Sequence, residues 1–98
     1  MGIDIIVQNQ IHQPIETVTG PAGSTLPDIV LRDPRMPMFQ GIHNYADTMF
    51  NSYQLQFLLR ELNDFEPRSE GERETISSLQ RAAELAIREH GYLWFSGD

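Results

Sequence analysis

Hydrophobic residues at the start of the chain follow the pattern of a β-strand. Ile3, Ile5 and Val7 recur at every second position, and their β-branched side chains favour extended backbone. A second alternating run covers about 14–19, and the polar segment between the two runs ends at Pro14. The pattern predicts an antiparallel hairpin with a long loop, and the more apolar first strand is expected inside the sheet.

The second half of the chain has helical periodicity. Apolar side chains recur every three or four residues over about 51–65 and again over about 70–90, with Pro67 between the two runs. Asn51 and Ser69 stand where a helix N-cap is needed, and both side chains can accept hydrogen bonds from the first free amides. We therefore predict a helical hairpin whose two apolar stripes cover a common surface.

The segment between the strands and the helices is harder to interpret. Glycine and proline prevent any long regular element over 20–37. Within it, 27–32 fits either a short helix capped by Ser24 or Thr25, or a brief extended piece. The run 38–43 predicts a weaker third strand, which Gly41 interrupts.

Together these elements predict the α+β class, with one domain over 1–98. The bulky apolar residues at 92–95 need to be covered in a soluble protein, which predicts a final strand there. The helical hairpin is expected on one face of a mostly antiparallel sheet of three or four strands. These strands are expected at about 3–8, 14–19, 38–43 and 92–96. A helical bundle with a peripheral β-hairpin is the alternative architecture.

Charge and composition narrow the functional classes. Fourteen acidic side chains are set against seven arginines, lysine is absent, and the formal net charge is -7. Nucleic-acid binding depends on Lys and Arg, so we expect no nucleic-acid partner. No run approaches the ~20 apolar residues of a membrane span, no signal-peptide pattern is present, and there is no Cys. We expect a soluble, cytoplasmic protein without a membrane partner, whose acidity suits either solubility or a basic partner.

Candidate binding residues gather in the stretch that leads into the first long helix. These are His43, Tyr45, Asp47 and Asn51, on a predicted loop, where binding residues concentrate. His43 and Asp47 could share a metal ion only if His12 converged on them from another loop, since no third ligand is local. A structural role for Asp47, in hydrogen bonding the backbone before the helix, is the favoured alternative. We therefore predict no metal site.

A second candidate is a contact patch of Met36, Met38 and Phe39. Flexible thioethers and an aromatic ring beside prolines can adapt to a partner, although the same side chains could fill the core. Catalytic motifs are missing: there is no Gly-x-Ser-x-Gly elbow, no Cys nucleophile and no phosphate-binding P-loop. We predict neither catalytic residues nor a cofactor.

Three short segments carry a resemblance. MGIDIIV (1–7), YADTMFN (45–51) and YLWFSGD (92–98) resemble segments of a set of small uncharacterised bacterial proteins, mainly actinobacterial and of about this length. The resemblance implies the order of elements given above, with 38–43 as a strand. It carries over no catalytic or binding residues.

The sequence does not specify a function, but it orders the hypotheses. The first is a non-enzymatic protein-binding or regulatory module, which acts on a protein partner or on a second copy as a homodimer. An immunity or antitoxin-like inhibitor with a basic partner belongs to the same class. The alternative class is a small metal-dependent hydrolase that uses His43 and Asp47.

Overall fold

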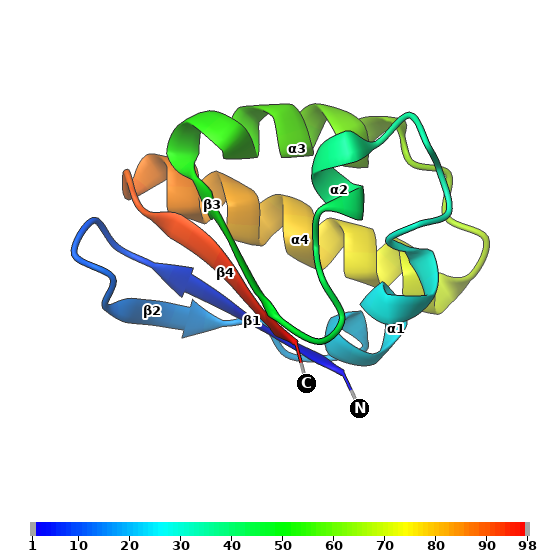
Figure 1. Ribbon diagram of the computed structural model, residues 1–98, viewed down its shortest axis with the longest axis horizontal. Coiled ribbons are helices and arrows are strands. Elements are labelled where there is room, and N and C mark those ends of the chain that lie inside the picture. Colours follow the sequence, from blue (N-terminus) through cyan, green and yellow to red (C-terminus); the bar gives the residue numbers. More distant parts are fainter. Residues whose placement is uncertain (1, 98) are drawn as a thin grey trace.

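Four antiparallel strands form one sheet, and four helices pack with it in the computed structural model, which describes residues 2–97 (Figure 1). The order across the sheet is β2-β1-β4-β3. The strands are β1 (Ile3–Gln8), β2 (Pro14–Thr17), β3 (Asp47–Asn51) and β4 (Tyr92–Gly97). The helices are α1 (Ala22–Ile29), α2 (Pro37–Gln40), α3 (Ser52–Asp64) and α4 (Glu70–Arg88). The α+β prediction is confirmed. None of these helices is both long and apolar enough to cross a membrane.

β1 lies inside the sheet, as its apolar sequence predicts. It pairs with β2 on one side and with β4 on the other, both antiparallel. Ile5 is opposite Phe95 and Val7 is opposite Leu93, and all four side chains are buried. The predicted β1–β2 hairpin is confirmed, although β2 ends at Thr17 rather than near residue 19. The sheet therefore has one face that supplies half of the hydrophobic core.

The other half of the core comes from the predicted helical hairpin, which the structure confirms. Asn51 and Gln54 form a reciprocal capping box at α3, with N···O distances of 2.8 and 2.9 Å. The Ser69 hydroxyl accepts from the amide of Glu72 at the start of α4. Both helices turn their apolar stripes toward the sheet, and the fully buried leucines include Leu58 and Leu79. Capping and periodicity together place these helices.

The predicted third strand over 38–43 is wrong. The short helix α2, Pro37–Gln40, overlaps this segment, and the third strand is β3 at Asp47–Asn51. The Glu61 carboxylate accepts from the amides of Met38 and Phe39 at 2.9 and 2.8 Å, which stabilises the first turn of α2. This contact joins residues more than twenty positions apart, so the local sequence pattern could not predict the helix.

The breaker-rich segment also differs from the prediction. A helix does form, but it covers Ala22–Ile29 rather than 27–32, and Pro27 lies inside it. Neither Ser24 nor Thr25 caps it. The Ser24 hydroxyl donates instead to the carbonyl of Pro21. The apolar residues of α1 lie one turn apart and are buried, so packing outweighs the low helix propensity of the segment.

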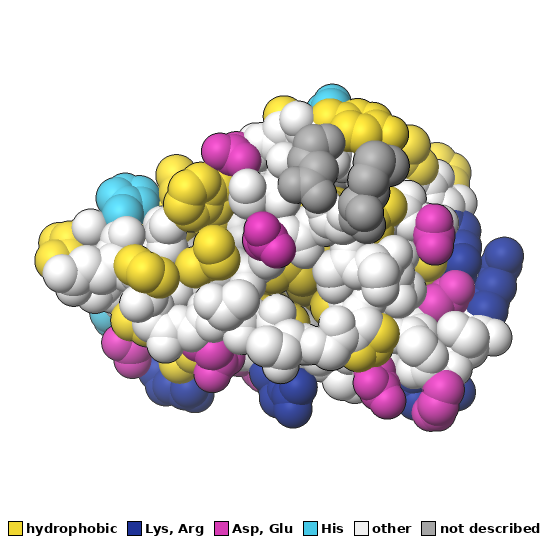
Figure 2. Space-filling view, turned by 90° about the horizontal axis from the view of Figure 1, so that it is seen from below, with side chains coloured by type: hydrophobic (Ala, Val, Ile, Leu, Met, Phe, Trp, Pro, Cys, Tyr) yellow, Lys and Arg dark blue, Asp and Glu magenta, His cyan; other side chains and the backbone are white. Residues whose placement is uncertain are grey.

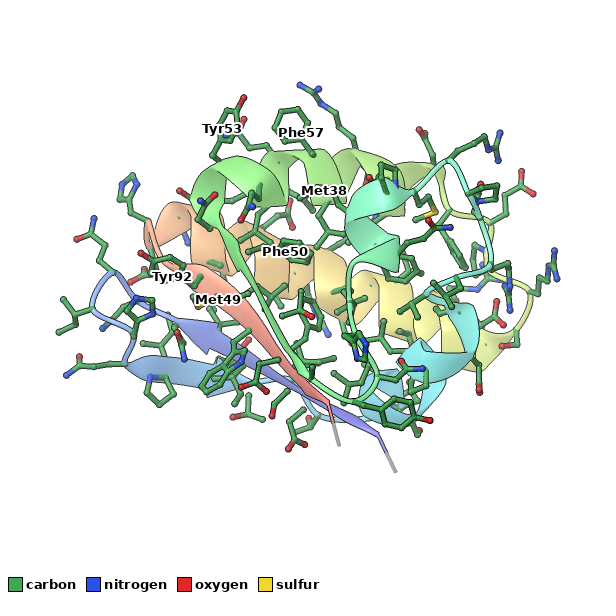
Figure 3. The ribbon with its side chains drawn as sticks, in the orientation of Figure 1. Met38, Met49, Phe50, Tyr53, Phe57 and Tyr92 are labelled. Carbon is green, nitrogen blue, oxygen red and sulfur yellow. The ribbon has the colours of Figure 1, made fainter. Side chains whose placement is uncertain are left out.

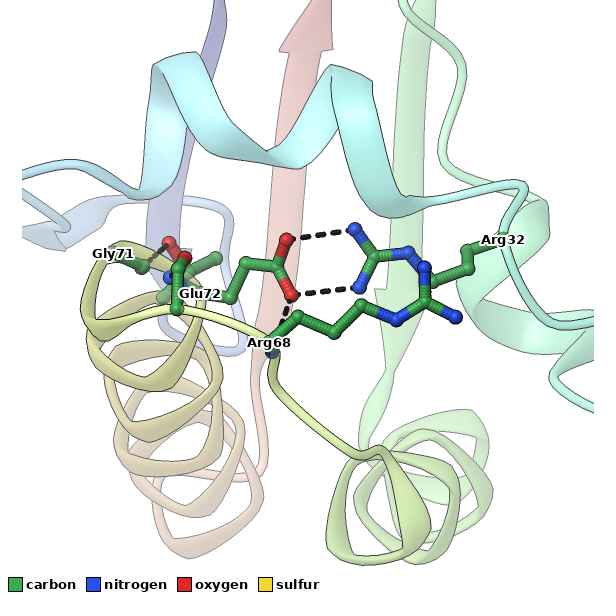
Figure 4. Close-up of polar contacts among 6 residues, drawn as sticks. Arg32, Arg68, Gly71 and Glu72 are labelled. Atoms are coloured by element: carbon green, nitrogen blue, oxygen red, sulfur yellow. Dashed lines mark hydrogen bonds and ion pairs between the residues drawn. The ribbon is translucent and has the colours of Figure 1, made fainter.

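An ion pair fastens the loop after α1 to the start of α4 (Figure 4). The Arg32 guanidinium donates to both carboxylate oxygens of Glu72 at 2.7 Å, and the amide of Arg68 donates to the same carboxylate at 2.8 Å. These hydrogen bonds, from the Arg32 side chain first and then from the backbone, lower the pKa of Glu72 to about 2. The Arg32 guanidinium also lies over the ring of Phe65, 5.6 Å from its centroid. Three hydrogen bonds and one cation–π contact therefore join the loop after α1 to the start of α4 and to the end of α3.

Candidate functional site on the open face of the sheet

Among residues 2–97 no helix lies on the second face of the sheet (Figure 1), and strand register determines which side chains lie there. Side chains alternate along a strand, so the neighbours of the buried Ile5 and Phe95 point to the opposite side. Ile6 is opposite Trp94, and Trp94 is opposite Met49 on the next strand. We call this surface the open face. It consists of Asp4, Ile6, Gln8, Thr17, Asp47, Met49, Asn51, Tyr92, Trp94 and Ser96.

An apolar row crosses the middle of the open face. Ile6, Trp94 and Met49 come from three adjacent strands, which lie about 4.8 Å apart in a sheet. Ile6 and Trp94 are half-buried, and Met49 is 47% exposed. Figure 2 shows hydrophobic side chains gathered on this side of the molecule. A contiguous apolar surface of this kind is typical of a contact site.

The β1–β2 loop forms a wall at one end of this row. Two bonds from the amides of Ile11 and Gln13 to the Asn9 side chain shape the loop. His12 then adopts a positive φ of 64° and stacks on Tyr92, with ring centroids 4.2 Å apart. His12 Nδ1 lies 3.0 Å from the side-chain oxygen of Gln8, which is buried although it belongs to the open face. The loop therefore covers part of the sheet and leaves the apolar row accessible.

The β1–β2 loop and the apolar row border a shallow, open pocket of about 430 Å³. Its lining residues are Gln8, His12, Asp47, Met49 and Trp94. Asp47 is opposite Ser96, and Ser96 is opposite Asp4, so both carboxylates belong to one row beside the apolar one. The pocket therefore combines an apolar floor, an imidazole on one side and a carboxylate on the other. Pockets with an apolar floor and a few polar groups are typical of binding sites.

The four predicted binding residues do not converge on one site. His43 and Tyr45 lie in the loop before β3 and line a separate depression of about 210 Å³. The Tyr45 amide donates to His43 Nδ1, and the two rings meet edge to face. Asp47 lies on the open face and Asn51 caps α3. Thr48, beside Asp47, accepts from the amide of His43 and donates to the carbonyl of Gly41, which fixes this loop.

The predicted patch of Met36, Met38 and Phe39 belongs largely to the core. Met36, which precedes α2, is 2% exposed, and Phe39 within α2 is 1% exposed, and both belong to the hydrophobic core cluster. The ring of Phe39 meets that of Phe65 edge to face. Met38 alone is partly exposed. The sequence allowed either a surface or a core role, and the burial assigns Met36 and Phe39 to the core.

The structure exposes residues that the sequence analysis missed. Tyr53 and Phe57 project from α3 away from the sheet, 67% and 38% exposed (Figure 3). Their rings meet edge to face, and the Arg60 guanidinium lies over the ring of Phe57. On the open face, Trp94 and Met49 were also missed. Their alternation with the buried Phe95 and Phe50 was the available signal, since a strand with one covered face must expose every second residue.

No geometry in the described chain favours metal chemistry. Among residues 2–97, no three His, Asp or Glu side chains are grouped so that they could hold a metal ion. His43 and Asp47 line different depressions, so their shared role in a hydrolase has no supporting observation.

A larger depression between β2 and α4 is a weaker candidate for a binding site. It measures about 530 Å³, and the charged side chains that line it are Glu16, Arg81, Glu84 and Arg88. Two cations and two anions leave no net charge to select a ligand, and the lining offers little apolar floor. The open face is therefore the better candidate site.

Comparison of the chain with protein-family models, curated proteins and solved structures finds no match. The resemblance to small actinobacterial proteins stays a prediction, and the chemistry of the site has to be argued from its residues.

Proposed function

We propose that this protein is a non-enzymatic binding module that holds a protein partner on the open face. The observation that carries the proposal is the row of Ile6, Trp94 and Met49 on the one sheet face without a helix. Aromatic and methionine side chains are enriched where proteins bind each other, and Trp is the commonest anchor residue. The row combines apolar area with an aromatic ring, that of Trp94, and it is accessible to a partner.

The edges of the sheet are less suited to binding than its face. β2 has four residues, begins at Pro14, and pairs with β1 through a register shift between Val7 and Gln8. Short strands, proline and bulges are features that discourage edge-to-edge pairing. β3, at the other edge, has five residues and continues directly into α3. These observations support the face as the contact surface.

A pair of variants tests this proposal. Met49→Asp places a charge at the exposed end of the apolar row, beside Trp94, whereas Tyr53→Asp makes the same kind of change on the far side of α3. Each variant and the wild type are immobilised and exposed to an extract of the cell that encodes the protein, and retained proteins are identified by mass spectrometry. We expect a partner that the wild type and Tyr53→Asp retain and that Met49→Asp loses.

The proposal fails if the three proteins retain the same set, or if the loss follows Tyr53 instead of Met49. Circular dichroism and thermal unfolding of both variants show whether each is folded. A folded Met49→Asp protein makes the loss attributable to the surface.

A further inference from the structure

We infer that the partner on the open face is a basic protein surface, on which Lys or Arg side chains flank aliphatic ones. This inference rests on the proposed function and adds the chemistry of the partner. It follows from the distribution of charge over the molecule, which is uneven in a way that the net charge alone does not reveal.

The strands carry acidic side chains and no basic ones. Asp4, Glu16 and Asp47 lie on strands, whereas all seven arginines lie on helices or loops. Register places Asp4 and Asp47 on the open face, on either side of Ser96 and one row beyond the apolar residues. In Figure 2 some acidic side chains lie among the hydrophobic ones, whereas others lie beside the arginines at the lower and right-hand edges of the view. A partner on this face meets apolar and negatively charged groups together.

Most carboxylates of the described residues form no ion pair, and the two on the open face are among them. Asp33, Glu70 and Glu72 each form an ion pair with an arginine. Asp4 and Asp47 form no ion pair with any residue of 2–97. Because a carboxylate that loses water on binding needs a positive partner, these two groups select a surface that brings one.

The aromatic side chains of this face favour the same partner. Trp94 lies in the apolar row, and Tyr92 lies in the adjacent row against His12. Guanidinium and ammonium groups stack on the faces of such rings, best on Trp. Trp94 lies in the row next to Asp4 and Asp47, so an arginine or lysine on a partner could stack on the indole and also pair with a carboxylate.

The same charges disfavour a second copy of this chain as the occupant. Two copies packed face to face would bring four carboxylates, from two Asp4 and two Asp47, into one interface without a basic group from any strand. Each copy also carries a formal charge of -7. Like charges brought together in a desolvated interface oppose association, so a basic partner is favoured over a homodimer.

The probe is a phage-displayed library of random peptides, selected on the immobilised full chain and depleted on the Met49→Asp variant. Peptides that depend on the open face are synthesised, and their affinities are measured by isothermal titration calorimetry. We expect these peptides to combine aliphatic residues with Lys or Arg. Binding should weaken about fivefold in Asp4→Asn/Asp47→Asn at low salt, and this difference should fade at high salt because exposed pairs are screened.

The matched control is Glu74→Gln/Glu84→Gln, which changes the net charge equally on exposed positions of α4. It should leave the affinity unchanged. Equal weakening by both double variants would overturn the inference, because the attraction would then come from the overall charge and not from the face.

Other outcomes separate this inference from the function on which it rests. Face-dependent peptides that are neutral or acidic would overturn the basic partner and leave the binding module intact. A library with no peptide that distinguishes the wild type from Met49→Asp would count against both. Sedimentation equilibrium that shows a dimer, dissociated by Met49→Asp, would identify a second copy as the occupant and overturn the inference.

Discussion

The two faces of this sheet are made of neighbouring residues and yet have different surroundings. Phe95 is completely buried against Phe50, with the two rings edge to face, whereas Trp94, one position earlier on the same strand, lies half-buried on the open face. The covered face has a helical layer to meet its apolar side chains. The open face has none, although it contains a tryptophan and a methionine in one row.

This difference shows that an apolar strand does not by itself reveal which of its residues hold the fold. Burial on one face stabilises the protein, whereas apolar side chains on the other face contribute little to folding and are available for contact. This distinction would be refuted if substitutions on the two faces reduced the free energy of unfolding equally.

The largest effect is expected on β4, where the two faces can be compared at adjacent positions. Phe95→Ala should lower the free energy of unfolding by about 3 to 5 kcal/mol, because it opens a cavity in the core. Trp94→Ala should cost about 1 to 2 kcal/mol, because the indole is only half-buried. Urea unfolding followed by circular dichroism measures both. If Trp94→Ala were as costly as Phe95→Ala, Trp94 would be a core residue and the open face would lose its anchor.

The next effect belongs to the Arg32–Glu72 contact and depends on pH. Since the pKa of Glu72 falls from 4.5 to about 2 on folding, the unfolded chain binds more protons between these values. The stability that Glu72 contributes is therefore complete above about pH 4.5 and is lost as the pH falls toward 2. We expect Glu72→Gln to be less stable than the wild type at neutral pH.

Urea unfolding of wild type and Glu72→Gln across this range measures the difference between them. The gap should close as the pH falls, whereas Glu84→Gln, on the exposed side of α4, should show no such gap. A constant gap from pH 7 to pH 2 would mean that the Glu72 carboxylate does not act through its charge.

A smaller effect is expected at Asn51, which was a candidate binding residue in the sequence and is a helix cap in the structure. Asn51→Ala removes the acceptor for the Gln54 amide and should destabilise the protein by about 1 kcal/mol. Asn51 lies on the open face in the row of Tyr92, one row away from Trp94 and Met49, and its side chain is held by the Gln54 amide. The affinity for a partner on the apolar row should therefore change less than in Met49→Asp. Chemical denaturation and calorimetry give the two values, and a loss of affinity as large as in Met49→Asp would extend the binding site to Asn51.

Much of the fold could be predicted because its signals are local. The period of two at Ile3–Val7, the helical stripes and the caps at Asn51 and Ser69 all act within a few residues, and each element formed where the pattern placed it. The position of β1 inside the sheet followed from its apolar sequence. Such agreement between propensity, pattern and capping is what makes an element predictable.

The errors have long-range causes. Segment 38–43 became a helical turn because Glu61 binds its first amides, and 47–51 became the third strand because β4 offered an edge to pair with. The site was missed for a related reason. The alternation along β4 shows that Trp94 and Phe95 lie on opposite faces. Which of the two faces the helices depends on where α3 and α4 lie, so the alternation alone did not identify Trp94 as the exposed residue.

The smallest effect on stability, and the sharpest test of the comparison, is expected at Met49. Met49 and Phe50 are neighbours on β3, but Met49 is 47% exposed and Phe50 is 6% exposed. Met49→Asp should therefore change the free energy of unfolding by only about 0.5 kcal/mol, the scale of strand propensity at an exposed edge position. Phe50→Asp should prevent stable folding, because it buries an unpaired charge.

Thermal and urea unfolding of the two variants measure this contrast directly. A small cost at Met49 would mean that the apolar row is not needed for folding, so that any loss of partner binding in Met49→Asp arises from the surface itself. A cost at Met49 close to that at Phe50 would show that the row is a second, thinner core. The carboxylates of Asp4 and Asp47 beside the row, unpaired within residues 2–97, would then be unexplained, because charged side chains rarely border a buried core without a partner.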